Sequence, residues 1–236
     1  MEKLRTHLIL EYLKKCKTCT LTELMERFGV SSATIHRDVA ELARRDAVER
    51  VRGGLIFRSP PPGRDGGAEY AERVVTNRAG KVAAAQKALA CITEGDILFL
   101  DSSTTVYELA VMLVKSDIAH LTIVTNSVSI IQNFRKMPAH WVLIGLGGTY
   151  DPQLNSILGA AALAQLAEFN ITKAFVSAFG VNEHDVTTNH ERQAEIIRKV
   201  LAAADRRYLI ADRSKIGRTG LYRLATRSAF NAIFTG

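Results

Sequence analysis

Six short apolar runs in the last two-thirds of the chain, each separated from the next by a helix-like segment, constrain the fold most strongly. The runs are almost entirely apolar, which is typical of strands buried on both faces of a sheet. Alternation of such strands with helices indicates a parallel sheet. We therefore predict an α/β domain with strands at 97–100, 121–124, 141–144, 174–178, 208–211 and 232–234, and helices at about 68–91, 106–114, 128–134, 159–168 and 191–204.

Residues 20–57 carry a different pattern, of two short helices, a tight turn and a hairpin. Thr20 or Thr22 can cap the first helix, and Gly29 supplies the positive φ that ends it. Ser31 or Ser32 can cap the second helix. Each helix has an apolar stripe at three- and four-residue spacing, which indicates one buried face. The stripes are Leu21, Leu24, Met25 and Phe28, then Ile35, Val39 and Leu42, and a preceding helix adds Leu4, Leu8, Ile9, Tyr12 and Leu13.

The polar face of the second helix predicts contacts with double-stranded DNA. Its first turns hold short or hydrogen-bonding side chains, which a recognition helix presents to the major groove. Strand-like runs at 48–51 and 55–57 flank Arg52-Gly53-Gly54, a hairpin signal that we interpret as a wing. Arg37 has an alternative role, an ion pair with Glu41 one turn along the helix. The predicted DNA contacts of this winged helix-turn-helix are Ser31, Ser32, Thr34, His36, Arg37, Arg50 and Arg52.

Charge and linker composition divide the chain. It has 31 Lys plus Arg against 24 Asp plus Glu, and residues 1–58 hold 12 of the basic and 8 of the acidic residues. This excess favours phosphate binding without establishing it alone. The prolines and glycines of residues 59–67 cannot continue a helix or strand. We expect a DNA-binding domain at 1–58, a linker at 59–67 and an α/β domain at 68–236.

Small hydroxyl, amide and glycine residues follow nearly every predicted strand. The carboxyl ends of such strands line one crevice, where helix N-termini direct N–H groups at an anion. Each segment taken singly is an ordinary helix cap, so the prediction depends on their recurrence. The expected ligand is a polyhydroxylated compound carrying a phosphate. Its expected contacts are Asp101, Ser102, Ser103, Thr104, Thr105, Thr125, Asn126, Ser127, Gly147, Gly148, Gly180, Asp212, Ser214 and Lys215.

Two absences narrow the function. The apolar runs are too short to span a membrane and no N-terminal signal peptide is evident, so we expect a cytoplasmic protein without a membrane partner. The cysteines Cys16, Cys19 and Cys91 include a single CxxC pair, with neither a second pair nor a nearby His pair to complete a zinc site. We therefore expect reduced thiols, no metal and no cofactor.

The motifs together resemble a known family. VSSATIHRDVAEL and the RVRGG wing, then FLDSSTT, VTNS, the GG pair and ADRSKIG, resemble the DeoR family of bacterial transcriptional regulators along essentially the whole chain. The resemblance implies a winged helix-turn-helix followed by a Rossmann-like sensor domain similar to ribose-5-phosphate isomerase. It also implies a repressor of a carbohydrate-catabolic operon, which responds to a phosphorylated sugar or related effector and acts as a homo-oligomer, a dimer or tetramer.

Four positions depart from the family pattern. Ser103 replaces the glycine of the usual DSGTT loop, which removes conformational freedom where a backbone approaches a ligand. Ile197 stands where a lysine is common, Ser177 where a glycine is expected and Gly236 where an acidic residue often follows the last strand. These changes bear on which effector is bound and how tightly.

Two alternatives accompany the regulator hypothesis. A sugar-phosphate isomerase would use Asp101, Asp212 and Lys215 as base and electrophile, although the DNA-binding head would then have no purpose. A DNA-binding regulator whose C-terminal domain no longer senses an effector is suggested by Ser103 and Ile197. We favour the responsive regulator, which has no catalytic residues.

Overall fold

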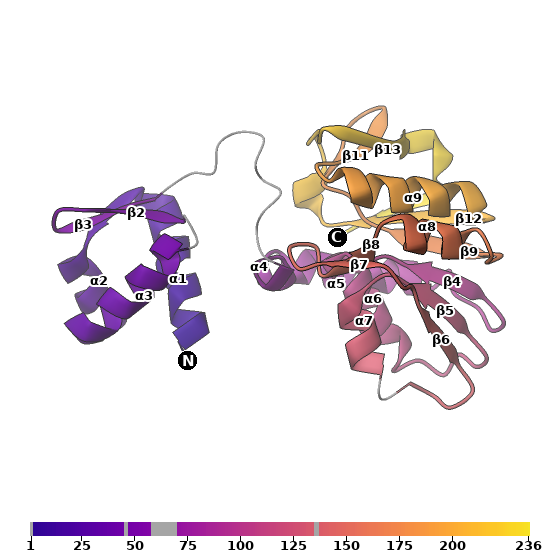
Figure 1. Cartoon of the computed structure of the whole chain (residues 1–236), viewed down its shortest axis with the longest axis horizontal. Helices are drawn as coiled ribbons and strands as arrows, with labels where there is room; N and C mark the ends of the chain where they lie inside the picture. The colour runs from indigo at the N-terminus through magenta and orange to yellow at the C-terminus, as the bar shows by residue number, and fades with distance from the viewer. Residues whose placement is uncertain (1, 45–46, 58–69, 135–136) are drawn as a thin grey trace. The chain divides into compact units, whose positions relative to one another are not determined.

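The structure is a computed structural model, which describes residues 2–44, 47–57, 70–134 and 137–236. The chain divides into two compact units, residues 1–65 and 66–236 (Figure 1). The linker expected at 59–67 and the boundary expected at residue 58 lie outside the described residues. Among the helices described, none combines the length and apolar character needed to cross a membrane.

The N-terminal unit packs three helices against a small antiparallel sheet with strand order β1-β3-β2. Val51 pairs with Gly54, so Arg52 and Gly53 form the two-residue turn of the predicted wing. Gly53 has a φ of 83°, which such a turn requires. The elements are α1 (Glu2–Cys16), β1 (Thr18–Thr20), α2 (Leu21–Phe28), α3 (Ser32–Arg44), β2 (Val48–Val51) and β3 (Gly54–Phe57).

Helix α2 has defined signals at both ends. The Thr20 hydroxyl accepts the Glu23 N–H at 3.1 Å, and the Glu23 carboxylate accepts the Thr20 N–H at 2.7 Å. Thr20 is therefore the cap, within a reciprocal capping box. Gly29, with a φ of 61°, ends the helix. The carbonyl of Ser31 then accepts N–H groups at 3.0 and 3.1 Å from the first turn of α3, so the turn between the helices is short.

The core of this unit differs from the prediction in α1. Ile9 and Leu13 are buried as predicted, and Leu10 is buried with them, but Leu8 is 47% exposed. The prediction that Leu8 is buried is wrong, because it lies beside the stripe formed by Ile9 and Leu13, which faces α3. The side chain of Leu4 lies outside the described part. Strand β1 was not predicted either, because three residues are too few for a periodic pattern.

The C-terminal unit is built on a six-stranded parallel sheet with order β14-β12-β9-β4-β5-β6. From β4 the chain adds strands outward on one side, then returns to β9 and adds strands on the other side. The order therefore reverses between β4 and β9, the place where open α/β sheets bind ligands. The predicted parallel α/β fold is confirmed, with β4 (Ile97–Leu100), β5 (Thr122–Thr125), β6 (Val142–Gly145), β9 (Lys173–Val176), β12 (Arg206–Ala211) and β14 (Ala232–Thr235).

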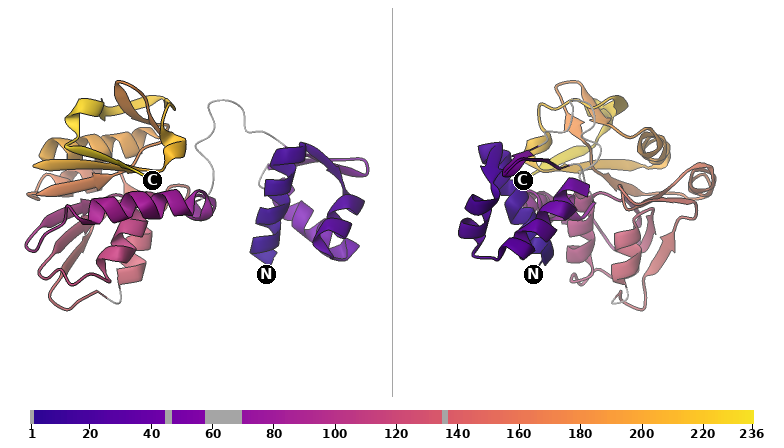
Figure 2. Two further views of the ribbon diagram at one scale, coloured as in Figure 1. Left: turned by 180° about the vertical axis from the view of Figure 1, so that it is seen from behind. Right: turned by 60° about the vertical axis from the view of Figure 1, so that its left-hand side comes forward.

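Helices cover both faces of this sheet, and alternate residues of a strand face opposite layers. Leu98 and Leu100 pack with α5, α6 and α7, whereas Phe99 packs with α8 and α9. Seen from behind, α5 runs along the first of these faces (Figure 2). The helices of this unit are α4 (Tyr70–Val75), α5 (Arg78–Leu89), α6 (Thr104–Leu113), α7 (Val128–Asn133), α8 (Ala160–Leu166) and α9 (Glu191–Ala203).

The single long helix predicted at about 68–91 is wrong: α4 and α5 are separate. Asn77, with a φ of 52°, breaks the helix between them. Small strands beyond the main sheet were also not predicted. They form a β7–β8 hairpin and a sheet of order β10-β11-β13, and short 3₁₀ turns complete the unit. Their bounds are β7 (Thr149–Asp151), β8 (Ser156–Leu158), β10 (Gly180–Val181), β11 (Asp185–Thr188), β13 (Tyr222–Thr226), η2 (Arg213–Lys215) and η3 (Arg227–Ala229).

Candidate nucleic-acid interface and candidate anion site

Helix α3 turns the predicted DNA contacts toward solvent. Its buried residues are Ile35, Asp38, Val39 and Leu42, which all lie on one face. The opposite face begins with no acidic residue in the first turn, so the positive end of the helix dipole is not neutralised. Ser31, Ser32, His36 and Arg37 are exposed, and Thr34 is partly exposed.

The wing lies beside this face. Arg50 and Arg52 are exposed, and Arg50 Nη2 lies 3.4 Å from Nδ1 of His36. Arg50 of the wing and His36 of α3 therefore lie side by side on the exposed surface. Arg37 forms no ion pair among the described residues, so its alternative pairing with Glu41 is absent there.

A buried ion pair fixes the angle at which α3 is presented. Asp38 is fully buried, and its carboxylate accepts bonds from Arg5 Nε at 2.5 Å and Arg5 Nη2 at 3.1 Å. Two bonds from one guanidinium orient both partners, so α3 is held firmly against α1.

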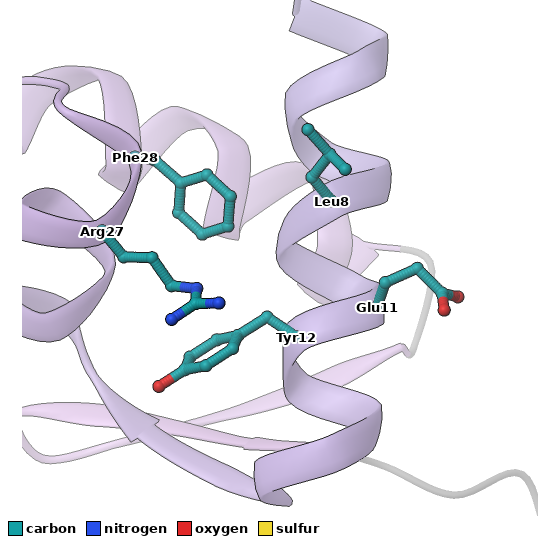
Figure 3. Close-up of a pocket in the computed structure, with 5 residues that line it drawn as sticks. All are labelled: Leu8, Glu11, Tyr12, Arg27 and Phe28. Atoms are coloured by element: carbon teal, nitrogen blue, oxygen red, sulfur yellow. The ribbon is translucent and has the colours of Figure 1, made fainter.

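A pocket of this unit lies away from the proposed DNA contacts. It is formed between α1 and α2, where the guanidinium of Arg27 lies 4.3 Å from the ring centre of Tyr12 (Figure 3). Leu8, Glu11 and Phe28 complete its lining. None of the seven predicted DNA contacts lines this pocket.

In the C-terminal unit, residues 101–105 follow β4, are buried and form the N-terminal end of α6. Asp101 accepts the N–H of Ser103 and the N–H of Ser177, each at 2.8 Å. Its carboxylate thereby joins the ends of β4 and β9 at the point where the strand order reverses. Burial raises the pKa of Asp101. Ser103 caps α6 through a bond to the N–H of Val106 at 3.2 Å, and Ser102, Thr104 and Thr105 are buried beside it.

The backbone at Ser103 needs no glycine. Its φ of −72° and ψ of 151° are ordinary extended values. The expected loss of freedom at this position is therefore not a source of strain. Ile197, in α9, is 1% exposed and belongs to the apolar core on that face of the sheet. This burial explains why an apolar residue stands where a lysine is common in the family.

The segment after β5 leaves one acceptor open. The Thr125 hydroxyl donates to Leu100 O at 2.6 Å and accepts the Ser127 N–H at 3.0 Å, and Ser127 caps α7. Asn126 Nδ2 donates to the Ser156 hydroxyl at 2.8 Å. Asn126 Oδ1 is buried and has no hydrogen-bond partner among the described residues.

The predicted glycines serve close packing. Gly147 N–H donates to Gln165 Oε1 at 2.9 Å. Gly148 has a φ of 152°, and a Cβ there would lie 2.5 Å from Leu158 O. A Cβ on Gly180 would collide with Arg218 O. Gly148 and Gly180 thus let two backbones meet, whereas a Cβ on Gly147 would meet the Gln165 side chain at 2.9 Å. Close packing accounts for all three without a ligand.

The segment after β12 combines Asp212 with a lysine. Asp212 Oδ1 accepts from the Ser214 N–H at 3.0 Å, from the Ser214 hydroxyl at 2.5 Å and from Asn77 Nδ2 at 3.2 Å. The Lys215 ammonium lies 6.0 Å from the ring centre of Phe179, and the Arg218 guanidinium 4.3 Å from it. Burial lowers the pKa of Lys215, and the nearby cations Arg218 and Arg73 lower it further, against the effect of Asp212.

Two cations that the sequence analysis missed complete this group. Lys81 of α5 is 4% exposed, and its ammonium donates to the carbonyl of Arg73 in α4. Burial lowers the pKa of Lys81 to about 8, with Lys215 and Arg73 also lowering it and Asp212 opposing them. Burial likewise lowers the pKa of Arg73. A lysine within the alanine-rich stretch RAGKVAAAQKALA was the signal that could have identified Lys81.

The turn of the β7–β8 hairpin joins this group to the segment after β5. Gln153 O accepts from Arg73 Nη2 at 3.0 Å, Asn155 Nδ2 donates to the Ser129 hydroxyl at 2.6 Å, and Ser156 accepts from Asn126. Figure 1 shows the hairpin beside α4, in agreement with the bond from Arg73 to Gln153. The hairpin therefore connects three segments that are far apart in the sequence.

The arrangement is suited to holding an anion that also carries hydrogen-bonding groups. Arg73, Lys81 and Lys215 supply partly desolvated positive charge near Asp212, and Asn126 supplies an open acceptor. No group of three or more His, Cys, Asp or Glu side chains that could hold a metal occurs in the described parts of the chain.

A winged helix-turn-helix joined to an α/β domain of this kind defines a class, the DNA-binding transcriptional regulators with a sensor domain. Comparison with family models places the chain more narrowly. Residues 5–60 match the DeoR-like helix-turn-helix domain and residues 76–236 match the DeoR C-terminal sensor domain. The chain belongs to the DeoR family of transcriptional regulators and is not an enzyme.

Curated relatives agree along almost the full chain. It is 28% identical over 227 residues to the HTH-type transcriptional repressor GlcR of Bacillus subtilis, covering 96% of this chain and 85% of GlcR. It is 30% identical over 236 residues to the regulator IolR of the same organism, covering 100% and 91%. It is 30% identical over 232 residues to the L-fucose operon activator of Haemophilus influenzae, covering 98% and 90%.

A solved structure of ribose 5-phosphate isomerase A from Neisseria gonorrhoeae is also similar. The TM-score is 0.40 and the identity 17%, over 58% of this chain and 52% of the isomerase chain. At this level the likeness carries no argument about activity. The family assignment depends on the two domain matches and the curated relatives.

Proposed function

We propose that the protein represses a carbohydrate-catabolic operon and that a phosphorylated sugar, or a metabolite derived from one, changes its affinity for operator DNA. The observation that carries the proposal is the group of Arg73, Lys81 and Lys215 around Asp212 beside the strand ends of the sensor. Cations that are desolvated and close together raise each other's energy, and a bound phosphate relieves that cost. The relatives named as regulators of sugar operons support this choice of ligand class.

The head reads DNA through two kinds of contact. Ser32, Thr34 and His36 reach base edges in the major groove, whereas Arg50 and Arg52 bind phosphates from the wing. Arg37 contacts a base or a phosphate at the same end of the helix. Two heads acting together on a two-fold symmetric operator require a dimer or a tetramer of the chain.

The effector's phosphate binds the three cations, and its sugar binds the segments after β4, β5 and β12. The positive N-terminal end of α6, which Ser103 caps, adds favourable potential for an anion beside the end of β4. Arg73 lies in α4, the first described element after the head. The effector therefore contacts the first described helix of the sensor unit.

The DNA part of the proposal is tested with labelled DNA from the upstream region of the protein's own operon. We expect binding at low salt that weakens steeply as salt rises, because phosphate contacts release counterions. The double variant R50A/R52A should bind all sequences more weakly and show a shallower salt dependence. Failure of the wild-type protein to bind at low salt, with or without sugar phosphates, contradicts the proposal.

The sensor part is tested by adding a panel of sugar phosphates, including fructose 6-phosphate and ribose 5-phosphate, to the protein–DNA complex. We expect at least one to change DNA affinity, and Lys215→Met to abolish the change while preserving DNA binding. Lys199→Met, on the exposed face of α9, is the matched control. An equal response from both variants contradicts the role of the cation group.

A further inference from the structure

Two buried polar atoms near the cation group have no hydrogen-bond partner within the described structure: the Tyr70 hydroxyl and Asn126 Oδ1. Buried polar groups are almost always paired, so unpaired ones require an explanation. The two atoms differ in chemistry. A tyrosine hydroxyl donates and accepts, whereas an amide oxygen only accepts.

Both atoms adjoin the hairpin turn that also holds Arg73. Asn126 is fixed through its amide nitrogen by Ser156, which leaves Oδ1 as its free end. Tyr70 lies one helical turn before Arg73 in α4, with the Arg73 guanidinium 5.5 Å from its ring centre. The Ser129 hydroxyl, held by Asn155 of the same turn, interacts with the Tyr70 oxygen and opposes the rise in the pKa of Tyr70 that burial causes. The hydrogen of the Tyr70 hydroxyl is left without an acceptor among the described residues.

Neither the phosphate of the ligand nor the cations that bind it can pair with both the Tyr70 hydroxyl and Asn126 Oδ1. The fully ionised phosphate group of an ester has no hydrogen to donate to Asn126 Oδ1, and the cations are already assigned to that group. The missing partner of Asn126 must be a donor on the uncharged part of the ligand. A hydroxyl group meets this need, and it can also pair with the tyrosine.

We propose that Tyr70, together with Asn126, determines effector specificity by binding hydroxyl groups of the phosphorylated ligand, so that the sensor distinguishes a polyhydroxylated phosphate ester from a plain phosphate anion. The proposal rests on the function proposed above. It adds Tyr70, which none of the sequence motifs contains, because Tyr70 lies in α4, two helices before the first strand of the sensor.

The test compares three probes by calorimetric titration of the full-length protein: inorganic phosphate, butyl phosphate, and the best-binding sugar phosphate of the panel. We expect the sugar phosphate to bind the wild-type protein at least ten times more tightly than butyl phosphate. Tyr70→Phe should weaken the sugar phosphate about tenfold, the effect of one hydrogen bond, and leave inorganic phosphate and butyl phosphate unchanged.

A second measurement separates this role from a structural one. Because the hydrogen of the Tyr70 hydroxyl has no acceptor among the described residues, Tyr70→Phe should unfold at about the same temperature as the wild-type protein without ligand. Tyr150→Phe is the matched control, since the Tyr150 hydroxyl already donates to Asn155 Oδ1 at 3.0 Å and is exposed. It should not alter the preference among the three probes.

The outcomes are distinguishable. If phosphate esters bind but Tyr70→Phe weakens sugar phosphate and butyl phosphate equally, the specificity role is wrong while the proposed function stands. The specificity role is also wrong if the wild-type protein does not prefer the sugar phosphate. If none of the three probes binds, the proposed function fails and the specificity role fails with it.

Discussion

Lys81 shows how a single residue connects stability with ligand binding. Its ammonium is buried beside other cations, and its pKa falls to about 8. An unfolded lysine has a pKa near 10.5, so folding at neutral pH keeps a proton at a site that disfavours it. Under the proposed function, a bound phosphate offsets this cost.

The pH dependence of unfolding tests this reasoning. Below pH 8 Lys81 is protonated in both states, and between about 8 and 10.5 only the unfolded chain keeps the proton, so the free energy of unfolding rises with pH. Relative to Lys81→Met, the wild-type protein should gain roughly 2 to 3 kcal/mol between about pH 7 and 10. Denaturant unfolding across that range measures the difference.

The control is Lys87→Met in the same helix. Lys87 is exposed and donates to Thr235 O at 2.6 Å. This substitution removes a lysine from the same helix without removing a buried charge, so it is the baseline against which the pH-dependent difference of Lys81→Met is judged. A constant difference for Lys81→Met would show that Lys81 is not desolvated in the folded state.

At this scale the sequence identified polar residues at the strand ends but not how they are used. Asp101 was expected to accept from a sugar, yet both of its oxygens accept backbone N–H groups. Arg73 and Lys81 were missed because they belong to helices, and they approach the strand ends only after the break at Asn77. Such proximity depends on tertiary packing, which a residue pattern does not encode.

Among the elements, the long periodic ones were predictable and the short ones were not. The six strands of the parallel sheet and helices α6 to α9 lie within a few residues of their predicted positions, because apolar runs and stripes extend over several residues. Strands β7 and β8 have three residues each and strand β10 has two. Their positions follow from backbone contacts, and the hairpin turn carries the carbonyl of Gln153 that accepts from Arg73.

Strand β10 gives the element-scale prediction. A Cβ on Gly180 would collide with the carbonyl of Arg218, and both belong to backbone that cannot yield easily. Gly180→Ala should therefore displace the loop that carries Lys215 and Arg218. We expect a loss of about 1 to 3 kcal/mol in the free energy of unfolding and a weaker response to sugar phosphate.

Gly145→Ala is the matched substitution for comparison. Its Cβ would meet only the end of the flexible Ile131 side chain, at 2.8 Å, so a small adjustment can accommodate it. Thermal unfolding and ligand titration of the two variants provide the measurement. Equal effects of both alanines would refute the backbone collision at Gly180.

On the scale of the whole molecule, each unit has a core of its own. The head buries Leu24, Ile35 and Val39 among other side chains, whereas the sensor has one apolar cluster on each face of its sheet. Units with separate cores unfold separately unless a large interface joins them. Both cores were recognisable in the sequence from their different periodicities.

Scanning calorimetry should therefore show two transitions. A sugar phosphate at about 100 times its dissociation constant adds roughly 2.7 kcal/mol to the sensor, which corresponds to a shift of roughly 5 to 10 °C. The transition of the head should not move. A single transition, or an equal shift of both, would contradict independent units; the same sugar without its phosphate serves as the control.

Helix α4 has no buried residue of its own, and polar ties to the hairpin turn and to Lys81 keep it in place. A ligand that changes these hydrogen bonds should therefore shift α4. A fluorescent dye attached at position 75, where Val75 is 54% exposed, would detect that shift as a change in fluorescence and so measure the metabolite without any DNA present.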